Sequence, residues 1–315
     1  MNPDGADHMS SPRLALGPVL YFWSRDDLFR FYREIAELPL DTVYLGETVC
    51  AKRRSLRLDD WLAIGRELAD AGKEVVLSSL ALIEAESELK SLRRLCANGR
   101  FLVEANDMAA VQLLAGETAF VAGPFVNIYN TRTLHKLAAL GMRRWVMPVE
   151  LSRDTLAAMQ AERPDGVETE LFAFGRLPLA LSARCFTARA HKLPKDDCQL
   201  RCLDYPDGML LSTQEGARFL ALNGIQTQSA HTYSLLYELD DVHALGVDLL
   251  RISPQWQHTA EIVQVFDDVL NKGRAIIDAD SELIGYMPAG PCDGYWRGVS
   301  GLTWRGGPEI VSAPQ

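Results

Sequence analysis

The chain has 315 residues, of which 48% are hydrophobic and 23% are charged. This composition can bury a large core and excludes a disordered or fibrous protein, and the length fits one large domain or two medium ones. Lysine and arginine number 32 against 42 aspartates and glutamates, a formal net charge of -10, which argues against a protein whose main task is to bind nucleic-acid phosphates.

The N-terminal segment, residues 1–13, is polar and small, which predicts a disordered tail without the apolar block of a secretory signal. A membrane-spanning helix requires about 18–20 consecutive apolar residues. Even the apolar stretch 120–129 is interrupted, by Gly123, Pro124 and Asn127. We therefore expect a cytoplasmic protein that is not an integral membrane protein. In that reducing compartment, clustered cysteines more often form a metal or redox site than disulfides.

From about residue 14, short apolar runs alternate with longer segments of helical period, as in repeated strand and helix units on a parallel sheet. The predicted strands are 14–22, 42–46, 74–80, 101–104, 118–122, 144–149, 168–174 and 247–252. The predicted helices are 26–38, 59–71, 83–96, 107–114, 131–140, 153–161, 234–245 and 258–271. Residues suited to helix capping precede several of them, namely Ser24, Asn106, Asn130 and Ser152.

Alternating strands and helices over this length favour an α/β fold of the (β/α)8, TIM-barrel-like type over an open sheet. The predicted barrel domain covers residues 14–273. The rhythm breaks at 175–224, a Cys-rich insertion after the seventh strand that is rich in Pro and Arg and shows no steady period. A loop of that length is usually functional or disordered. Residues 274–315 read as an irregular C-terminal extension packed on the barrel.

The six cysteines are at 50, 96, 185, 198, 202 and 292. Cys185, Cys198 and Cys202 form a C-x12-C-x3-C pattern inside the insertion, which starts at the C-terminal end of a strand. Cys50 comes four residues after the predicted second strand, at the same end of the barrel, where barrel enzymes build their sites. We therefore expect these four thiols to converge.

Four thiolates suit either tetrahedral zinc or an iron–sulfur cluster. Only one closely spaced pair, Cys198 and Cys202, resembles a zinc knuckle, so the spacing favours the larger cluster. The segment 176–204 carries six basic and three acidic side chains, which would offset the charge of a thiolate-bound cluster. The alternative is that the thiols are buried or incidental. Cys96 follows an amphipathic helix and reads as inert, and Cys292 reads as a spare thiol.

The other candidate site residues lie beyond strand ends. Lys52, Arg53 and Arg54 predict either a solvated loop or a lip that attracts an anionic substrate or an acidic partner. Glu47 and Glu104, with Asn106 and Glu150, are placed to line the barrel mouth, and Trp256 is either a stacking residue for an aromatic ligand or a packed rim residue. Sequence motifs for a serine hydrolase, zinc protease, dinucleotide site or ATP site are absent. The catalytic residues are not identifiable from the sequence.

The segment YLGETVCAKRR around Cys50, together with the C-x12-C-x3-C pattern, resembles the collagenase-like family once classed as peptidases. The closest resemblance is to its branch in oxygen-independent ubiquinone biosynthesis, and it extends from about residue 14 to 310. It implies a [4Fe–4S] cluster on Cys50, Cys185, Cys198 and Cys202, with no matching role for Cys96 or Cys292.

The resemblance also implies an activity and partners. The chain would be a subunit of a heterodimeric hydroxylase that acts without O₂ on a polyprenylated aromatic ubiquinone precursor, paired with the paralogous iron–sulfur protein UbiU. Prephenate would be linked to the supply of the hydroxyl oxygen, and a UbiT-like lipid-binding protein would assist. The alternatives are a scaffold whose cluster staples it to the active subunit, or a protease or RNA-modifying relative of the same family.

Overall fold

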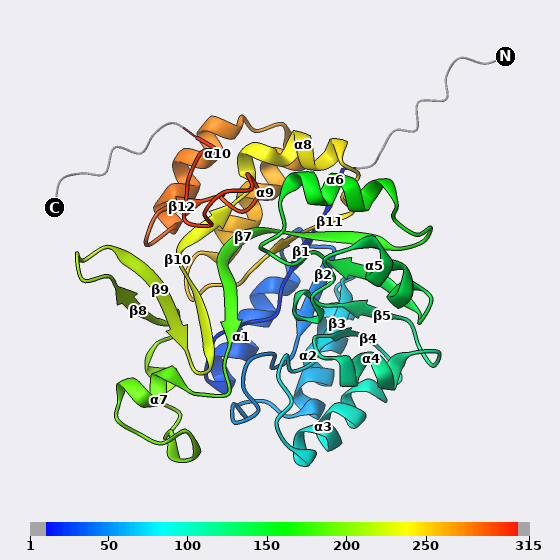
Figure 1. The fold of residues 1–315 in the computed structure, drawn as a ribbon, viewed down its shortest axis with the longest axis vertical. Helices are drawn as coiled ribbons and strands as arrows, with labels where there is room; N and C mark the ends of the chain where they lie inside the picture. Colours follow the sequence, from blue (N-terminus) through cyan, green and yellow to red (C-terminus); the bar gives the residue numbers. More distant parts are fainter. Residues whose placement is uncertain (1–10, 308–315) are drawn as a thin grey trace.

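The computed structural model describes residues 11–307. Within them, eight parallel strands close into a barrel, because the eighth strand pairs with both the first and the seventh. The barrel strands are β1 (Arg13–Leu16), β2 (Thr42–Leu45), β3 (Glu74–Ser78), β4 (Leu102–Ala105), β5 (Phe120–Ala122), β6 (Met142–Val146), β7 (Glu168–Leu181) and β11 (Leu249–Ile252). The predicted (β/α)8 barrel is confirmed (Figure 1).

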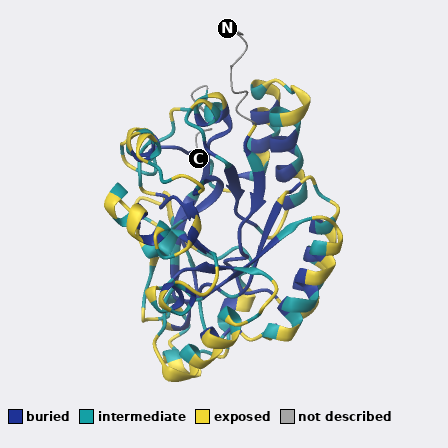
Figure 2. Ribbon diagram, turned by 90° about the vertical axis from the view of Figure 1, so that its right-hand side faces the viewer, coloured by how far each residue is buried: buried dark blue, intermediate teal, exposed yellow. Residues whose placement is uncertain are grey.

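Helices surround the barrel and turn their apolar faces toward it (Figure 2). They are α1 (Arg25–Ala36), α2 (Leu58–Asp70), α3 (Glu86–Cys96), α4 (Met108–Leu114), α5 (Thr131–Ala138), α6 (Arg153–Ala161), α8 (Leu239–Ala244) and α9 (Thr259–Lys272). Ser24, Asn130 and Ser152 cap helices as predicted, each accepting a hydrogen bond from a backbone N–H. The cap of α4 is Asp107 rather than Asn106. None of the described helices is long and apolar enough to cross a membrane.

The insertion after the seventh strand is more regular than predicted. Strand β7 runs past the barrel and pairs in antiparallel fashion with β10 (Gln226–Ser234), which pairs with β9 (Arg218–Asn223), which pairs with β8 (Met209–Ser212). This sheet and the short helix α7 (Phe186–Ala190) project from one side of the barrel (Figure 1). Polar residues of β10 such as Gln226 and Gln228 are fully buried, so the strand carries no apolar alternation that a sequence pattern would reveal.

The C-terminal extension is also more regular than predicted. It contains helix α10 (Ile276–Leu283) and a short strand, β12 (Pro291–Cys292), which adds to β10 in parallel. Residues 1–10 and 308–315, which include most of the predicted N-terminal tail and the end of the extension, lie outside the described residues. Of the predicted tail, Arg13 already belongs to β1.

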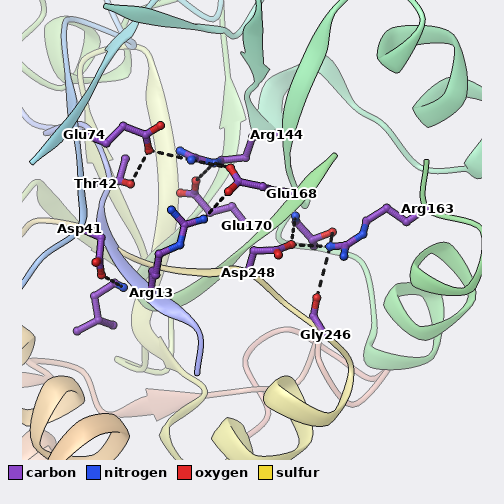
Figure 3. Close-up of polar contacts among 12 residues, drawn as sticks. Arg13, Asp41, Thr42, Glu74, Arg144, Arg163, Glu168, Glu170, Gly246 and Asp248 are labelled. Carbon is purple, nitrogen blue, oxygen red and sulfur yellow. Dashed lines mark hydrogen bonds and ion pairs between the residues drawn. The ribbon is translucent and has the colours of Figure 1, made fainter. Parts of the chain in front are cut away.

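One group of charged side chains in the barrel interior is organised around Arg144. Arg144 is 2.8 Å from Glu74 and 2.7 Å from Glu168 (Figure 3). The Tyr44 hydroxyl donates a hydrogen bond to Glu170. Burial raises the pKa of Tyr44 well above its ordinary value, and Glu170 raises it further. Buried charges of this kind require close partners, and strands from different parts of the chain supply them.

A second group of charged side chains in the interior is organised around Arg251. Its Nε donates to Glu170 at 2.5 Å, its Nη2 is 2.8 Å from Glu104, and its guanidinium lies 4.1 Å from the centre of the Tyr44 ring. Both carboxylate side chains are 0% exposed. Burial alone would lower the pKa of Arg251, but Glu104 and Glu170 outweigh it and raise that pKa. The interior is therefore packed and charge-paired rather than open.

Candidate metal centre

The loop after β2 holds Cys50 in a fixed turn. The Glu47 carboxylate accepts hydrogen bonds from the backbone N–H groups of Val49 and Cys50, both at 2.9 Å. Gly46 begins the turn with a φ of +136°, and a Cβ there would lie 2.4 Å from the carbonyl oxygen of Ser78. Only glycine fits this position without displacing the neighbouring strand.

The insertion carries the other three cysteines on short helical turns. Cys185 caps the N-terminus of α7, and its sulfur accepts a hydrogen bond from the backbone N–H of Ala188 at 3.4 Å. Cys198 follows the 3-10 helix Lys195–Asp197, and Cys202 lies in the 3-10 helix Arg201–Asp204. Two consecutive residues between them, at positions 199 and 200, have positive φ values of 49° and 52°, so the chain reverses tightly between the two thiols.

The turn between β9 and β10 gathers these segments. The Asn223 amide donates to the carbonyl oxygens of Cys202, at 3.3 Å, and Tyr205, at 2.9 Å. The Gly224 carbonyl accepts from the N–H of Phe186, the residue after Cys185, at 3.1 Å. One Asn-Gly turn therefore positions both Cys185 and Cys202. An Asn-Gly pair is a strong hairpin signal, and it is the signal that could have revealed this hairpin in the sequence.

Arg53 joins this turn to the Cys50 loop. Its Nη1 donates to the Leu20 carbonyl at 3.1 Å, and its Nη2 donates to both the backbone carbonyl and the side-chain oxygen of Asn223. Its backbone N–H donates to the Cys50 carbonyl at 2.9 Å. The Arg53 side chain is 0% exposed, so it lies inside the protein and not on a surface lip.

The four cysteines consequently share one neighbourhood. Cys50 and Cys185 pack against the same small apolar group, formed by Leu20, Val49 and Ile225. Burial raises the pKa of Cys202 to about 11; Arg53 opposes this, while Cys50 and Cys185 add to it. Cys198 and Cys50 also contribute to the raised pKa of Lys52, after its hydrogen bond to Asp196. All four thiols are free of disulfides.

Two lysines tie the insertion to the barrel loops. Lys52 donates to the Lys195 carbonyl at 2.8 Å and to the Asp196 carboxylate at 2.9 Å. Lys195 in turn donates to both carboxylate oxygens of Glu84 and to the Ala183 carbonyl, at 2.7 Å. Both lysines therefore hold the segment between Cys185 and Cys198 against the loops that follow β2 and β3.

The donor set consists of four cysteine thiols, which as thiolates suit either a zinc ion or an iron–sulfur cluster. No group of three or more His, Cys, Asp or Glu side chains within residues 11–307 is arranged to hold one metal ion. The Arg53 Nε is buried without a hydrogen-bond partner among the described residues, and a thiolate, which is the metal-binding form of cysteine, would give it a negatively charged neighbour.

A sequence profile of peptidase family U32 matches residues 30–282. The chain belongs to peptidase family U32. The family resemblance expected from the Cys50 segment and the cysteine spacing is thereby confirmed.

Solved structures with similar chains share only low identity with this U32 protein. The U32 peptidase Mk0906 is 12% identical with a TM-score of 0.45, over 79% of this chain and 95% of that one. An O-GlcNAc hydrolase variant from Thermobaculum terrenum is 10% identical, with a TM-score of 0.37, over 88% and 63%. A spore coat polysaccharide biosynthesis protein from Bacillus subtilis is 10% identical, with a TM-score of 0.37, over 93% and 74%.

The remaining residues singled out from the sequence lie as follows. Glu104 is fully buried and accepts hydrogen bonds from Ser78 and Asn106, so it belongs to the barrel interior rather than to an open mouth. Arg54 is exposed and bonds only weakly to its own loop, at 3.4 Å. Glu150 is exposed and accepts a hydrogen bond from the Tyr129 hydroxyl.

Trp256 and the two bystander cysteines also have clear positions. Trp256 packs edge-on against Trp23, with ring centres 5.3 Å apart, which makes it a rim residue. Burial raises the pKa of Cys96 to about 11 and that of Cys292 to about 12. Cys292 is 0% exposed in β12, remote in the fold from the Cys50 loop. Cys96 ends α3 and packs against the main core.

A small cavity adjoins the cysteine site. It lies between the loops after β1 and β2, is lined by Tyr21, Trp23, Trp61, Glu47 and Arg53 among others, and has a volume of about 20 Å³. A space of that size holds about one water molecule. The cavity is therefore too small for an aromatic ring.

Proposed function

We propose that this U32 protein binds one [4Fe–4S] cluster through Cys50, Cys185, Cys198 and Cys202. Four cysteine thiolates are the usual ligand set of such a cluster. The observation that carries the proposal is the Asn223–Gly224 turn, which brings two insertion cysteines to the loop of Cys50 through Arg53. When bound, the group would supply one-electron chemistry at this end of the barrel.

The chain's own residues would shape the site around the cluster. Glu47 fixes the backbone of the Cys50 turn, and Lys52 and Lys195 hold the insertion closed over it. Arg53 and Asn223 fill the space between the loop and the insertion. These contacts hold the positions of the four cysteine-bearing segments, as outer-shell residues do around metal ligands.

We further propose that the chain is a UbiV-like protein of oxygen-independent ubiquinone biosynthesis. Membership of family U32 and the YLGETVCAKRR segment with its cysteine spacing support this assignment. In this role the chain would pair with UbiU to hydroxylate the polyprenylated ring, with prephenate linked to the supply of the hydroxyl oxygen and a UbiT-like lipid-binding protein assisting. The cavity beside Arg53 holds about one water molecule, so the ring would bind elsewhere.

A scaffold role is the second candidate, and one observation favours it. One proposed ligand, Cys50, belongs to a barrel loop, whereas the other three belong to the insertion. A cluster shared in this way would staple the insertion to the barrel, and metal binding of this kind contributes directly to folding stability. The partner-binding surface would then depend on the cluster even if no electron passes through it.

Single Cys→Ala variants separate the two roles. Cys185→Ala and Cys50→Ala remove one proposed ligand from each side, and Cys96→Ala is the matched control because Cys96 lies outside the site. Each variant is purified without oxygen, tested for co-purification with UbiU, and tested for restoring ubiquinone to an anaerobically grown deletion strain.

The catalytic role predicts that loss of the cluster abolishes ubiquinone synthesis while the complex with UbiU persists. The scaffold role predicts that the complex dissociates in the same variants. Full complementation by Cys50→Ala and Cys185→Ala would contradict both roles. Cleavage of a peptide substrate, or RNA binding, by the purified complex would instead support the alternatives in which the chain is a protease or an RNA-modifying enzyme.

A further inference from the structure

Arg53 is a buried cation whose charge is incompletely matched. The nearest carboxylate oxygen belongs to Glu47 and is 3.6 Å from Nη1. The other partners of the guanidinium are neutral oxygens of Leu20 and Asn223, and its Nε has no hydrogen-bond partner among the described residues. A buried charge is costly unless an opposite charge and hydrogen bonds compensate it.

The chain around Arg53 is built to hold the guanidinium in this place. Gly224 has a φ of +69°, and a Cβ at this position would lie 2.8 Å from Nη2 of Arg53. The Arg53 guanidinium also lies over the Phe22 ring, 5.8 Å from its centre. The glycine therefore permits the close approach of the hairpin turn, and the guanidinium cannot swing out to water.

Arg53 lies between two of the proposed ligands. Its backbone N–H binds the Cys50 carbonyl, and its side chain shares Asn223 with the Cys202 carbonyl. The Cys50 side chain packs against Leu20, whose carbonyl accepts a hydrogen bond from Nη1 of Arg53. The guanidinium therefore lies between the barrel loop that carries Cys50 and the part of the insertion that carries Cys202.

We infer that Arg53 is the buried counter-ion of the thiolate-bound cluster and sets its reduction potential. The inference rests on the proposed cluster and adds a positioning residue that the four ligands do not include. A cluster with four thiolates carries net negative charge, and each reduction adds one more negative charge. A fixed cation beside it favours the reduced form, because local charge and hydrogen bonds to sulfur are principal determinants of such potentials.

Three variants test the inference. Arg53→Gln removes the charge but keeps a polar side chain, and Arg53→Lys keeps the charge without the planar guanidinium group. Lys52→Gln is the matched control, since it removes one positive charge from the adjacent residue, whose side chain is 36% exposed and pairs with Asp196. Iron content, thermal stability and the midpoint potential are measured on each anaerobically purified protein, the last by a redox titration followed by EPR.

We expect Arg53→Gln to shift the midpoint potential to a more negative value. Arg53→Lys is expected to stay closer to the unchanged protein, and Lys52→Gln is expected to shift the potential less than Arg53→Gln, since water screens its charge. If Arg53→Gln fails to retain iron, restoration of iron by Arg53→Lys supports the same conclusion, because the lysine returns only the charge.

Several results would overturn the inference. One is a midpoint potential of Arg53→Gln equal to that of the wild-type protein. Another is a shift of the midpoint potential in Lys52→Gln as large as the shift in Arg53→Gln. Loss of iron in both Arg53 variants would assign Arg53 a structural role instead. A wild-type protein that binds no iron would refute the proposed cluster itself. Failure of the inference about Arg53 is therefore distinguishable from failure of the proposed cluster.

Discussion

Replacement of Arg251 by methionine tests whether the barrel interior depends on its ion pairs. The substitution keeps the length of the side chain and removes the cation that contacts Glu170 at 2.5 Å and Glu104 at 2.8 Å. Both carboxylates are fully buried, so neither can be compensated by water. Removing one partner of a buried ion pair costs about 3–5 kcal/mol.

This loss corresponds to a measurable fall in melting temperature. With an unfolding entropy of about 2 cal/mol/K per residue, it amounts to roughly 5–8 °C for a chain of this length. The assay is thermal and urea unfolding of Arg251→Met beside Arg163→Met. Arg163 also pairs with a carboxylate, that of Asp248, but its side chain is 26% exposed (Figure 3), so its loss should cost about 1 kcal/mol or less.

The double variant Arg251→Met/Glu170→Gln completes the test. If the two residues compensate one another, the double variant loses less stability than the two single losses combined, by about 1–3 kcal/mol. A cost below about 1 kcal/mol for Arg251→Met, or strictly additive losses, would refute the view that the interior ion pairs hold the barrel together.

Three further predictions concern single positions. Gly46→Ala should lower the free energy of unfolding, measured with urea, by about 2–3 kcal/mol, because its Cβ would lie 2.4 Å from the Ser78 carbonyl oxygen. Gly72→Ala is the control and should lower it less, because Gly72 also has a positive φ, of +87°, but no atom lies within 4 Å of its Cβ position. Burial raises the pKa of the folded Cys292 thiol to about 12, so above about pH 9 the thiol ionises in the unfolded chain first and the free energy of unfolding falls. Cys292→Ala should therefore make the free energy of unfolding depend less steeply on pH in this range. An unchanged pH dependence would contradict this. Lys195→Ala should speed proteolysis within 182–208 with little change in melting temperature, because its ammonium ties the insertion to the β3–α3 loop; an unchanged cleavage rate would count against that tether.

The alternation of strands and helices is readable from the sequence because it depends on local periodicity. Six of the eight barrel strands lie within three residues of their predicted bounds, as do seven of the eight barrel helices, whereas β7 runs seven residues past its predicted end and α8 begins five residues after its predicted start. The first strand was predicted to reach Phe22 but ends at Leu16. Gly17 and Pro18 stop it, since proline has no N–H for the next ladder bond, and an apolar run alone does not show this.

The site was harder to predict because long-range contacts decide it. The Lys52–Arg54 run reads as a solvated basic loop, yet Arg53 is buried by contacts with Leu20 and with Asn223, 170 residues away. The ionic barrel interior was also missed. Arg144, Glu170 and Arg251 each occur within apolar strands, and their partners lie on other strands. A lone charge in a strand pattern signals burial with a partner, but it does not identify that partner.

The central claim is that four of the six cysteines hold a [4Fe–4S] cluster. The most direct measurement is iron and sulfide analysis of anaerobically purified protein, combined with mass spectrometry of cysteine alkylation before and after iron chelation. We predict four irons and four sulfides per chain, with Cys96 alkylated first, the four ligands reactive only after chelation, and Cys292 protected throughout by its burial. Zinc or no metal, or equal alkylation of the four cysteines before and after chelation, would contradict the account.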